Sequence, residues 1–447
     1  MVESNIFNED SYYSEYKKIR NQFRKYHSYS IIHGCLDYIY SPTEEELGEC
    51  RKMPWLVLLL VKWVLLDENH NSNNKKLIDG QQLWKILNSI HGMAKYARMP
   101  DQYHHYTLFF RNIAYQQFIY QRQFSINHLS RQHALFGDLQ SNNLIRKKFE
   151  ELTGVEIEDF LELSIATLVR FIDRNEKSLP ATWLSTMSHH YSSSVIENFY
   201  NCISSTMGDI KKTFISNDNG RRISHEYYEQ TPFQKFPIIT DKKEYLCVHP
   251  MVLFRALENY VYDKLRDWDS QAFMGKFGPM FERYVEKSIV HSGLPYANEN
   301  DLKKRLSIKR NVVDFLVTDN GANIFIDAKG VEMAEKGKVT HSPIVIRDKV
   351  KNSIIKAINQ SYDVLNQLEN IESNHPVISN RRINYIIVVT FKELYLGNGV
   401  NFYHAIAKEK IDEIENKFAP TKIPIENMFF LTIEEFDLFT QLVFEKE

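Results

Sequence analysis

The sequence has few cysteines, and their spacing does not suit a metal site. Its four cysteines, Cys35, Cys50, Cys202 and Cys247, are scattered over 447 residues, and no two of them form a C-x-x-C pair. Structural zinc sites usually contain such pairs, so the sequence argues against one. Single scattered cysteines are typical of a reducing compartment, and we expect a cytoplasmic protein with free thiols.

The sequence also lacks a long hydrophobic run and a recognisable secretion signal. Its most apolar stretch, residues 55–66, is interrupted by Lys62 and is shorter than the roughly 20 residues that a membrane span needs. Its first residues, MVESNIFNEDSYY, are acidic and polar rather than basic and then apolar. We therefore expect no membrane partner and predict a buried helix over residues 55–66, opened by Pro54.

Neither sign of charge dominates the chain. The formal net charge of −2 excludes a generally basic nucleic-acid coat protein, so any contact with nucleic acid must come from local patches. A hydrophobic content of 43% and a charged content of 25% are ordinary for a globular protein. The length allows two or three domains with cores of their own.

The first half of the chain is predicted to be mostly helical. Residues 54–210 carry apolar residues at helical spacing and few strand signals, as in LIDGQQLWKILNSIHGMAKYA and VEIEDFLELSIATLVRFID. We assign residues 1–225 to a helical domain that senses, binds or gates. Tyr115, Tyr120 and Arg122 lie in another such stretch. They either stack on bases or, more commonly for such residues, form helix core and surface.

Residues 226–447 are assigned to a second domain, with a core at about 270–447. Its first part predicts a hairpin of two short strands around residues 241–243, followed by a helix after Pro250. Near the C-terminus, Thr432 begins a T-x-E-E pattern that is typical of a helix start. We therefore expect a last strand that leads directly into a terminal helix.

The most informative stretch is VVDFLVTDNGANIFIDAKG, residues 312–330. It predicts two apolar strands joined at Asn320-Gly321, the preferred central pair of a type I′ hairpin turn. With this turn, Asp319 pairs with Ala322, and the register of the whole hairpin follows. One face would carry Val313, Phe315, Val317, Ile324, Ile326 and Ala328.

The same register places Asp314 directly opposite Asp327, on one face with Lys329. Opposed residues have Cβ atoms roughly 4.5–5.5 Å apart, and like charges there destabilise a sheet. A divalent cation would remove this repulsion, and Mg²⁺ is usually held by one or two carboxylates, waters and phosphate oxygens. Lys329 would orient or help deprotonate the attacking water. The alternative is a solvated hairpin in which Lys329 neutralises one carboxylate.

Asp314 followed by Asp327-Ala328-Lys329 on consecutive strands resembles the PD-(D/E)xK nuclease superfamily, which includes type II restriction enzymes. The resemblance covers about residues 270–447. It implies an α+β or α/β fold class, with a helical N-terminal half followed by a restriction-endonuclease-like αβββαβ core. Val313 stands where the family often has proline. The family's first helix, motif strands, second helix and next strand correspond to residues 278–285, 312–317, 324–329, 348–368 and 385–390.

The resemblance also implies a Mg²⁺ site, with Mn²⁺ able to substitute, held by Asp314, Asp327 and the main-chain carbonyl of Ala328. An acidic residue of the family's first helix often completes this site. Glu282 lies at the border of that helix's apolar face, whereas Glu286 lies further toward solvent, so we choose Glu282 as a metal ligand and catalytic residue.

In many family members a polar residue of the second helix, often glutamine, points at the active site. Gln360 resembles it, and we include Gln360 among the catalytic candidates. Its position nearly opposite the apolar face of its helix leaves an ordinary solvated role equally open. Lys356 lies one turn earlier on the same polar side and is a candidate phosphate contact.

Basic residues flank the motif and would form a rim for phosphate, although alternating charges of this kind are also common on solvated surfaces. They are Lys303, Lys304, Arg305, Lys309, Arg310, Lys336, Lys338 and Arg347. The predicted function is a Mg²⁺-dependent endonuclease, preferably acting on DNA. By analogy alone, such an enzyme fits bacterial defence against phage. A protein trigger of the helical domain and a homo-oligomer are further expected partners.

Two other functions stay open. One is a catalytically inactive nuclease fold that binds nucleic acid or protein. The other is a repair or transposition subunit that cuts only with partner proteins. The intact set of Asp314, Asp327 and Lys329 argues against the first.

Overall fold

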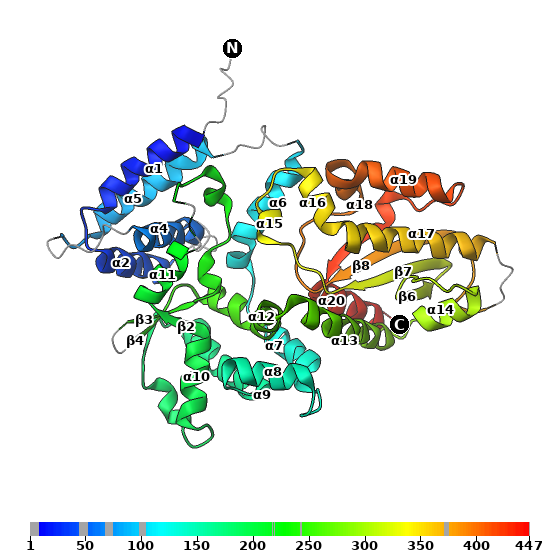
Figure 1. Cartoon of the computed structure of the whole chain (residues 1–447), viewed down its shortest axis with the longest axis horizontal. Helices are drawn as coiled ribbons and strands as arrows, with labels where there is room; N and C mark the ends of the chain where they lie inside the picture. Colours follow the sequence, from blue (N-terminus) through cyan, green and yellow to red (C-terminus); the bar gives the residue numbers. More distant parts are fainter. Residues whose placement is uncertain are drawn as a thin grey trace, which may run out of the picture. The chain divides into compact units, whose positions relative to one another are not determined.

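The computed structural model describes residues 9–43, 52–67, 75–97, 104–216, 218, 220–241, 244–370 and 375–446 (Figure 1). Cys50 lies outside the described residues, and so does the side chain of Lys336. Cys35, Cys202 and Cys247 are free thiols, as the sequence predicts.

The chain divides into two compact units. The first comprises Met1–Gln102 and Asn112–Trp268, and the second comprises Tyr103–Arg111 and Asp269–Glu447. The division therefore follows Trp268 rather than residue 225. The sequence analysis grouped residues 226–268 with the second domain, but their strands pair within the sheet of the first unit. It also gave no sign that Tyr103–Arg111 belongs to the second unit.

The first unit combines helices with one small sheet. Strands β1 (Ser178–Pro180), β2 (Ser204–Thr206), β3 (Ile238–Asp241) and β4 (Glu244–Cys247) lie in the order β1-β4-β3-β2. The predicted hairpin of β3 and β4 is confirmed, whereas β1 and β2 were not predicted. The helices are α1 (Glu9–Phe23), α2 (Ser28–Tyr40), α4 (Pro54–Leu66), α5 (Gly80–His91), α7 (Asn127–Gln132), α8 (Leu144–Thr153), α9 (Ile157–Leu168), α10 (Ser193–Ile203), α11 (Met207–Ser216) and α12 (Pro250–Trp268). Helix α6 (Tyr106–Gln117) belongs to the second unit up to Arg111 and to the first from Asn112.

The most apolar stretch of the sequence forms the predicted buried helix. Helix α4 has Pro54 in its first turn, and most of its side chains are buried, including Trp63. Among the described residues, no helix is long and apolar enough to span a membrane.

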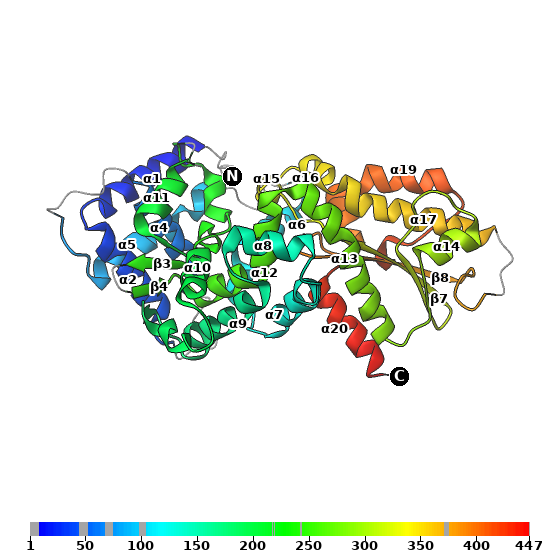
Figure 2. The ribbon, with the colours of Figure 1, turned by 60° about the horizontal axis from the view of Figure 1, so that its bottom comes forward.

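The second unit is built on a sheet of five strands in the order β5-β6-β7-β8-β9. Strands β5 to β7 are antiparallel, and β8 and β9 continue the sheet in parallel. Helices cover both faces, with α13 and α20 on one side and α17 and α19 on the other (Figures 1 and 2). The elements are α13 (Ser270–His291), β5 (Tyr296–Asn298), α14 (Glu299–Leu306), β6 (Phe315–Asp319), β7 (Ala322–Lys329), α15 (Glu335–Lys338), α16 (Pro343–Val350), α17 (Lys356–Glu369), β8 (Ile383–Thr390), α18 (Gly399–Phe402), α19 (Lys408–Phe418), β9 (Met428–Thr432) and α20 (Ile433–Phe444).

The mixed α+β class is confirmed, with one helix boundary corrected. The sequence predicts the first helix of this unit over residues 278–285, but α13 begins at Ser270 and contains Pro279 in its interior. The side chain of Asp269 accepts a hydrogen bond from the backbone N–H of Ala272, which caps the helix start. The predicted start of α20 is confirmed, because Thr432 and Glu435 form a capping box.

Candidate functional site

The turn at Asn320-Gly321 gives the hairpin its predicted register. Asn320 and Gly321 have φ angles of 43° and 84°, and a type I′ turn requires two positive φ values. Asp319 pairs with Ala322, as predicted. Local turn chemistry therefore sets which side chains share a face of the sheet.

Asp314 lies one residue before β6 begins, so the strand starts later than predicted. Its carboxylate oxygen Oδ2 accepts a hydrogen bond of 2.7 Å from the backbone N–H of Ala328. A side chain of the first strand thus takes a backbone donor of the second. In a strand, the N–H and C=O of one residue point to the same side, so the carbonyl of Ala328 also faces this side.

Asp327 is buried without full compensation for its charge. Asp327 is 1% exposed, and its Oδ1 atom is paired with the ammonium of Lys329. Its Oδ2 atom has no hydrogen-bond partner among the described residues. Burial and then the nearby Asp314 raise the pKa of Asp327 well above its usual range, and Lys329 only partly opposes them.

Lys329 is held in its charged form by the same neighbours. Burial alone would lower the pKa of its ammonium, but the carboxylates of Asp327 and Asp314 raise the pKa overall. Lys329 is therefore a hydrogen-bond donor at neutral pH. The expectation that it helps to deprotonate a water is not favoured by this electrostatic setting.

Glu282 lies on α13, half-buried, within electrostatic reach of the hairpin. Burial, followed by the charges of Asp314, Glu299 and Glu286, raises the pKa of Glu282 to about 7, while Lys329 opposes this rise. Glu286 accepts a hydrogen bond of 3.2 Å from the hydroxyl of Tyr296. The choice of Glu282 over Glu286 as a metal ligand stays a prediction.

Gln360 on α17 is buried, so the solvated alternative for it is wrong. Its Nε2 atom donates a 2.7 Å hydrogen bond to the carbonyl of Val312, two residues before Asp314. Its Oε1 atom is buried without a hydrogen-bond partner among the described residues. Simple helix phase failed because α17 is covered on both sides, with Ser361 and Asp363 buried as well. Lys356 is exposed.

The described carboxylates do not by themselves form a complete metal site. No group of three or more His, Cys, Asp or Glu side chains within the described part of the chain is arranged to hold a metal ion. Mg²⁺ needs only one or two carboxylates, because waters and substrate oxygens fill the other positions. The unpartnered Oδ2 atom of Asp327 and the adjacent Asp314 fit that donor set.

The predicted basic rim is partly neutralised by acidic partners. Arg310 makes two hydrogen bonds of 2.6 Å to Asp363, and Lys303 lies 2.8 Å from Glu299. The Lys304, Arg305 and Lys309 side chains are exposed. Arg347 lies 2.7 Å from Glu409, and Lys338 lies 3.8 Å from Glu332.

Sequence reasoning missed the charged residues just beyond the ends of β7 and β8. Glu332 and Lys392 are largely buried and lie 3.3 Å apart, and Arg111 from α6 is buried in the same unit. A charged residue in a loop after a strand is an ordinary pattern. No signal in the sequence connects Arg111 with residues more than two hundred positions later.

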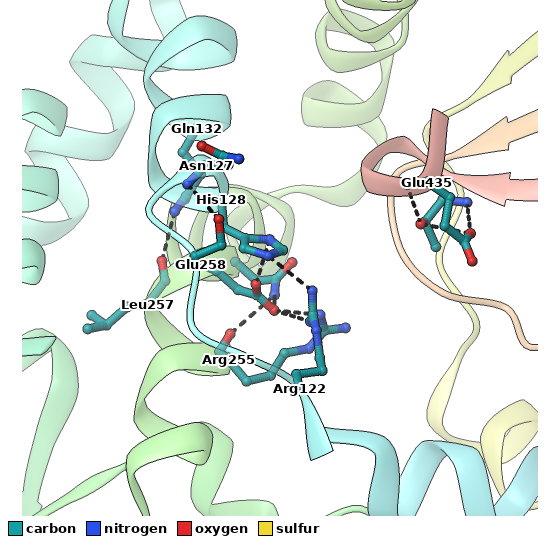
Figure 3. Close-up of polar contacts among 11 residues, drawn as sticks. Arg122, Asn127, His128, Gln132, Arg255, Leu257, Glu258 and Glu435 are labelled. Atoms are coloured by element: carbon teal, nitrogen blue, oxygen red, sulfur yellow. Dashed lines mark hydrogen bonds and ion pairs between the residues drawn. The ribbon is translucent and has the colours of Figure 1, made fainter. Parts of the chain in front are cut away.

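The first unit contains a buried acidic side chain of a different kind. Glu258 on α12 faces Arg122, Arg255 and His128, which point toward it (Figure 3). Arg122 and Arg255 donate to its Oε1 atom at 2.8 Å and 2.6 Å, and the Nδ1 atom of His128 lies 3.0 Å from Oε2. Burial would raise the pKa of Glu258, but Arg255, His128 and Arg122 together hold it well below its usual range.

Comparisons with known proteins add no family assignment. No protein-family model, no curated protein and no solved structure matches this chain. The functional argument therefore depends on the geometry of the site.

Proposed function

We propose that the chain is a metal-dependent endonuclease of the PD-(D/E)xK type, which hydrolyses phosphodiester bonds. DNA is the substrate that we propose for it. The observation that carries this proposal is the pair of Asp314 and the uncompensated, buried Asp327, with Lys329 beside them. A buried carboxylate that lacks a partner is costly, and such groups gather at functional sites.

The order of elements in the second unit supports the same proposal. Helix α13, the antiparallel strands β5 to β7, the helical run that ends with α17, and strand β8 follow one another along the chain. This order corresponds to the αβββαβ core of the nuclease superfamily, with α14 added between β5 and β6. On this proposal Asp314, one residue before β6, and Asp327 in β7 would take the motif positions.

Each residue of the site has a chemical role in this proposal. Asp314, Asp327, Glu282 and the carbonyl of Ala328 would hold a Mg²⁺ ion, which would neutralise the carboxylates and polarise a phosphoryl oxygen. Lys329, as an ammonium, would orient the attacking water and offset the negative charge that builds on the phosphate.

Two residues of the proposed site lie on helices beside the hairpin. Glu282, with a pKa of about 7 in the metal-free protein, would release its proton on binding the ion. Gln360 would hold the backbone before Asp314 through the carbonyl of Val312.

The test is cleavage of plasmid, linear and single-stranded DNA and of RNA by the full chain with Mg²⁺ or Mn²⁺, beside EDTA controls. We expect metal-dependent cutting that Asp327→Ala abolishes and that Lys329→Ala slows by about 10²- to 10³-fold. Asp319→Asn, at the exposed end of the same hairpin, is the matched control and should cut normally. Full activity in Asp327→Ala would contradict the proposal.

A non-catalytic binding module is the second candidate, and one observation favours it. Within the described residues, no three acidic or histidine side chains are arranged to hold a metal. Such a module would bind nucleic acid or protein without taking up Mg²⁺.

A partner-dependent repair or transposition subunit would give a different result, because cutting would appear once its partner or DNA end is added.

A further inference from the structure

Arg111 is a side chain from the first half of the sequence that belongs to the second unit. It is 2% exposed, and its guanidinium donates to three backbone carbonyls. Nη1 lies 2.6 Å from the carbonyl of Gly337 and 3.3 Å from that of Lys338, and Nε lies 3.2 Å from that of Leu394. Figures 1 and 2 both show the start of α6 beside α15.

These carbonyls belong to the two segments that leave the sheet beside the candidate site. Gly337 and Lys338 lie in the segment after β7, the strand of Asp327 and Lys329. Leu394 lies in the segment after β8, the parallel neighbour of β7. The guanidinium of Arg111 therefore bridges two segments that are not consecutive in the chain.

Buried charges join the same two segments a second time. Glu332, after β7, lies 3.8 Å from Lys338 in its own segment and 3.3 Å from Lys392, after β8. One carboxylate is thus shared by Lys338 in α15 and Lys392 just after β8. Arg111 adds hydrogen bonds to neutral carbonyls rather than a further ion pair.

The bridged segments continue directly into the backbone and helix of the site. The carbonyl of Lys329 accepts a 3.4 Å hydrogen bond from the N–H of Phe391, whose ring lies 5.0 Å from that of Phe277 and 5.9 Å from that of Phe281. A Cβ atom on Gly330 would come within 2.9 Å of the Phe277 ring. The end of β7 is therefore packed tightly against α13, the helix of Glu282.

We propose that Arg111 is a positioning residue for the candidate site. By holding the segments after β7 and β8 together, its guanidinium fixes the end of β7 against α13 and so sets where Lys329 stands relative to Glu282. This inference rests on the proposed function. Arginine suits the task because its planar group offers several donors in a fixed fork, whereas lysine offers a single mobile ammonium.

The experiment compares Arg111→Met, Arg111→Lys and the matched control Arg146→Met in the full chain. Arg146 also donates to two backbone carbonyls, those of Gly137 and Leu139 at 2.9 Å and 3.0 Å, but lies in the first unit. Cleavage rates at saturating and at limiting DNA, Mn²⁺ affinity and hydrogen exchange of segments 330–342 and 391–398 are measured for each.

We expect Arg111→Met to lower kcat by about 10²-fold, the typical effect of misplacing a catalytic group by about 1 Å, with KM unchanged. Arg111→Lys should be intermediate, and Arg146→Met should cut at the wild-type rate. Exchange in segments 330–342 and 391–398 should speed up in Arg111→Met and stay unchanged in the control.

Equal losses of activity in the Arg111 and Arg146 variants, or unchanged exchange in both segments, would overturn the inference. A wild-type protein that does not cut would instead refute the proposed function. In that case, faster exchange together with weaker Mn²⁺ binding in Arg111→Met would still support a positioning role, and their absence would refute it.

Discussion

Each unit of this protein buries an acidic side chain among charged neighbours, but the neighbours differ in sign. Glu258 in the first unit faces two arginines and a histidine, which hold its pKa well below the usual range. Asp327 in the second unit faces one lysine and another carboxylate, and its pKa is raised well above the usual range. Burial acts on both groups in the same direction, so the partners alone decide the outcome.

The contrast separates a compensated buried charge from one that is only partly compensated. A buried charge with opposite charges around it ties elements together, as Glu258 does for α12, α7 and the loop that carries Arg122. A buried charge beside a like charge lowers stability. Such a charge is typical of sites where a bound ligand of opposite charge neutralises it. We therefore interpret Asp327 as a ligand for a cation, whereas Glu258 is already paired with two arginines and a histidine.

The largest effect is expected from removing the structural charge. Glu258→Gln leaves the partly buried Arg122 and Arg255 without the buried carboxylate that they face, and breaking a buried ion pair costs up to about 3–5 kcal/mol. Urea denaturation measures this loss. The control is Glu435→Gln at the exposed N3 position of a capping box, for which little loss is expected because Gln also serves there. If Glu258→Gln and Glu435→Gln lowered the free energy of unfolding equally, Glu258 would have no special structural role.

Neutralising Asp327 should not lower the free energy of unfolding of the metal-free protein. Asp327→Asn removes the repulsion with Asp314 while keeping the size of the side chain, so we expect no loss of stability and a gain of up to ~1 kcal/mol. The ammonium of Lys329 keeps Asp314 as a nearby counter-charge. Denaturation in EDTA, beside Asp319→Asn, checks this, and a loss of several kcal/mol would mean that Asp327 is a structural charge like Glu258.

The third effect concerns the pH dependence of stability and Glu282. The pKa of Glu282 is about 7 in the folded protein, above the usual value near 4.3. Such a group costs nothing while it is protonated in both states, and the folded state loses stability as pH rises from about 4.5 through 7. Glu282→Gln should therefore become relatively more stable than the wild type over that range. A difference in unfolding free energy between Glu282→Gln and the wild type that stays constant from pH 5 to 8 would contradict this.

Local rules were sufficient to predict the hairpin and its charged face. The Asn320-Gly321 turn fixes the register, and strand alternation then groups Asp327 with Lys329. The capping pattern at Thr432 and the buried helix after Pro54 were equally local, and both are observed. Glu282 was chosen from helix phase, and its role as a metal ligand stays a prediction.

Features that depend on tertiary packing were not predictable in this way. Gln360 was judged by helix phase, but α17 is covered on both sides, so its polar side is also buried. Tyr115 and Tyr120 are buried, which excludes base stacking, and Arg122 meets a carboxylate more than one hundred residues away. The unit boundary and the place of Arg111 likewise follow from contacts between distant parts of the chain.

The most direct test of the account is a calorimetric titration of metal-free protein with Mn²⁺. We predict that the wild type and Asp319→Asn bind the ion, that Asp327→Asn does not, and that Glu258→Gln, where it remains folded, binds as the wild type does. Absence of Mn²⁺ binding to the wild type, or equal binding to the wild type and Asp327→Asn, would contradict the claim that Asp327 and Asp314 form a metal-dependent catalytic site.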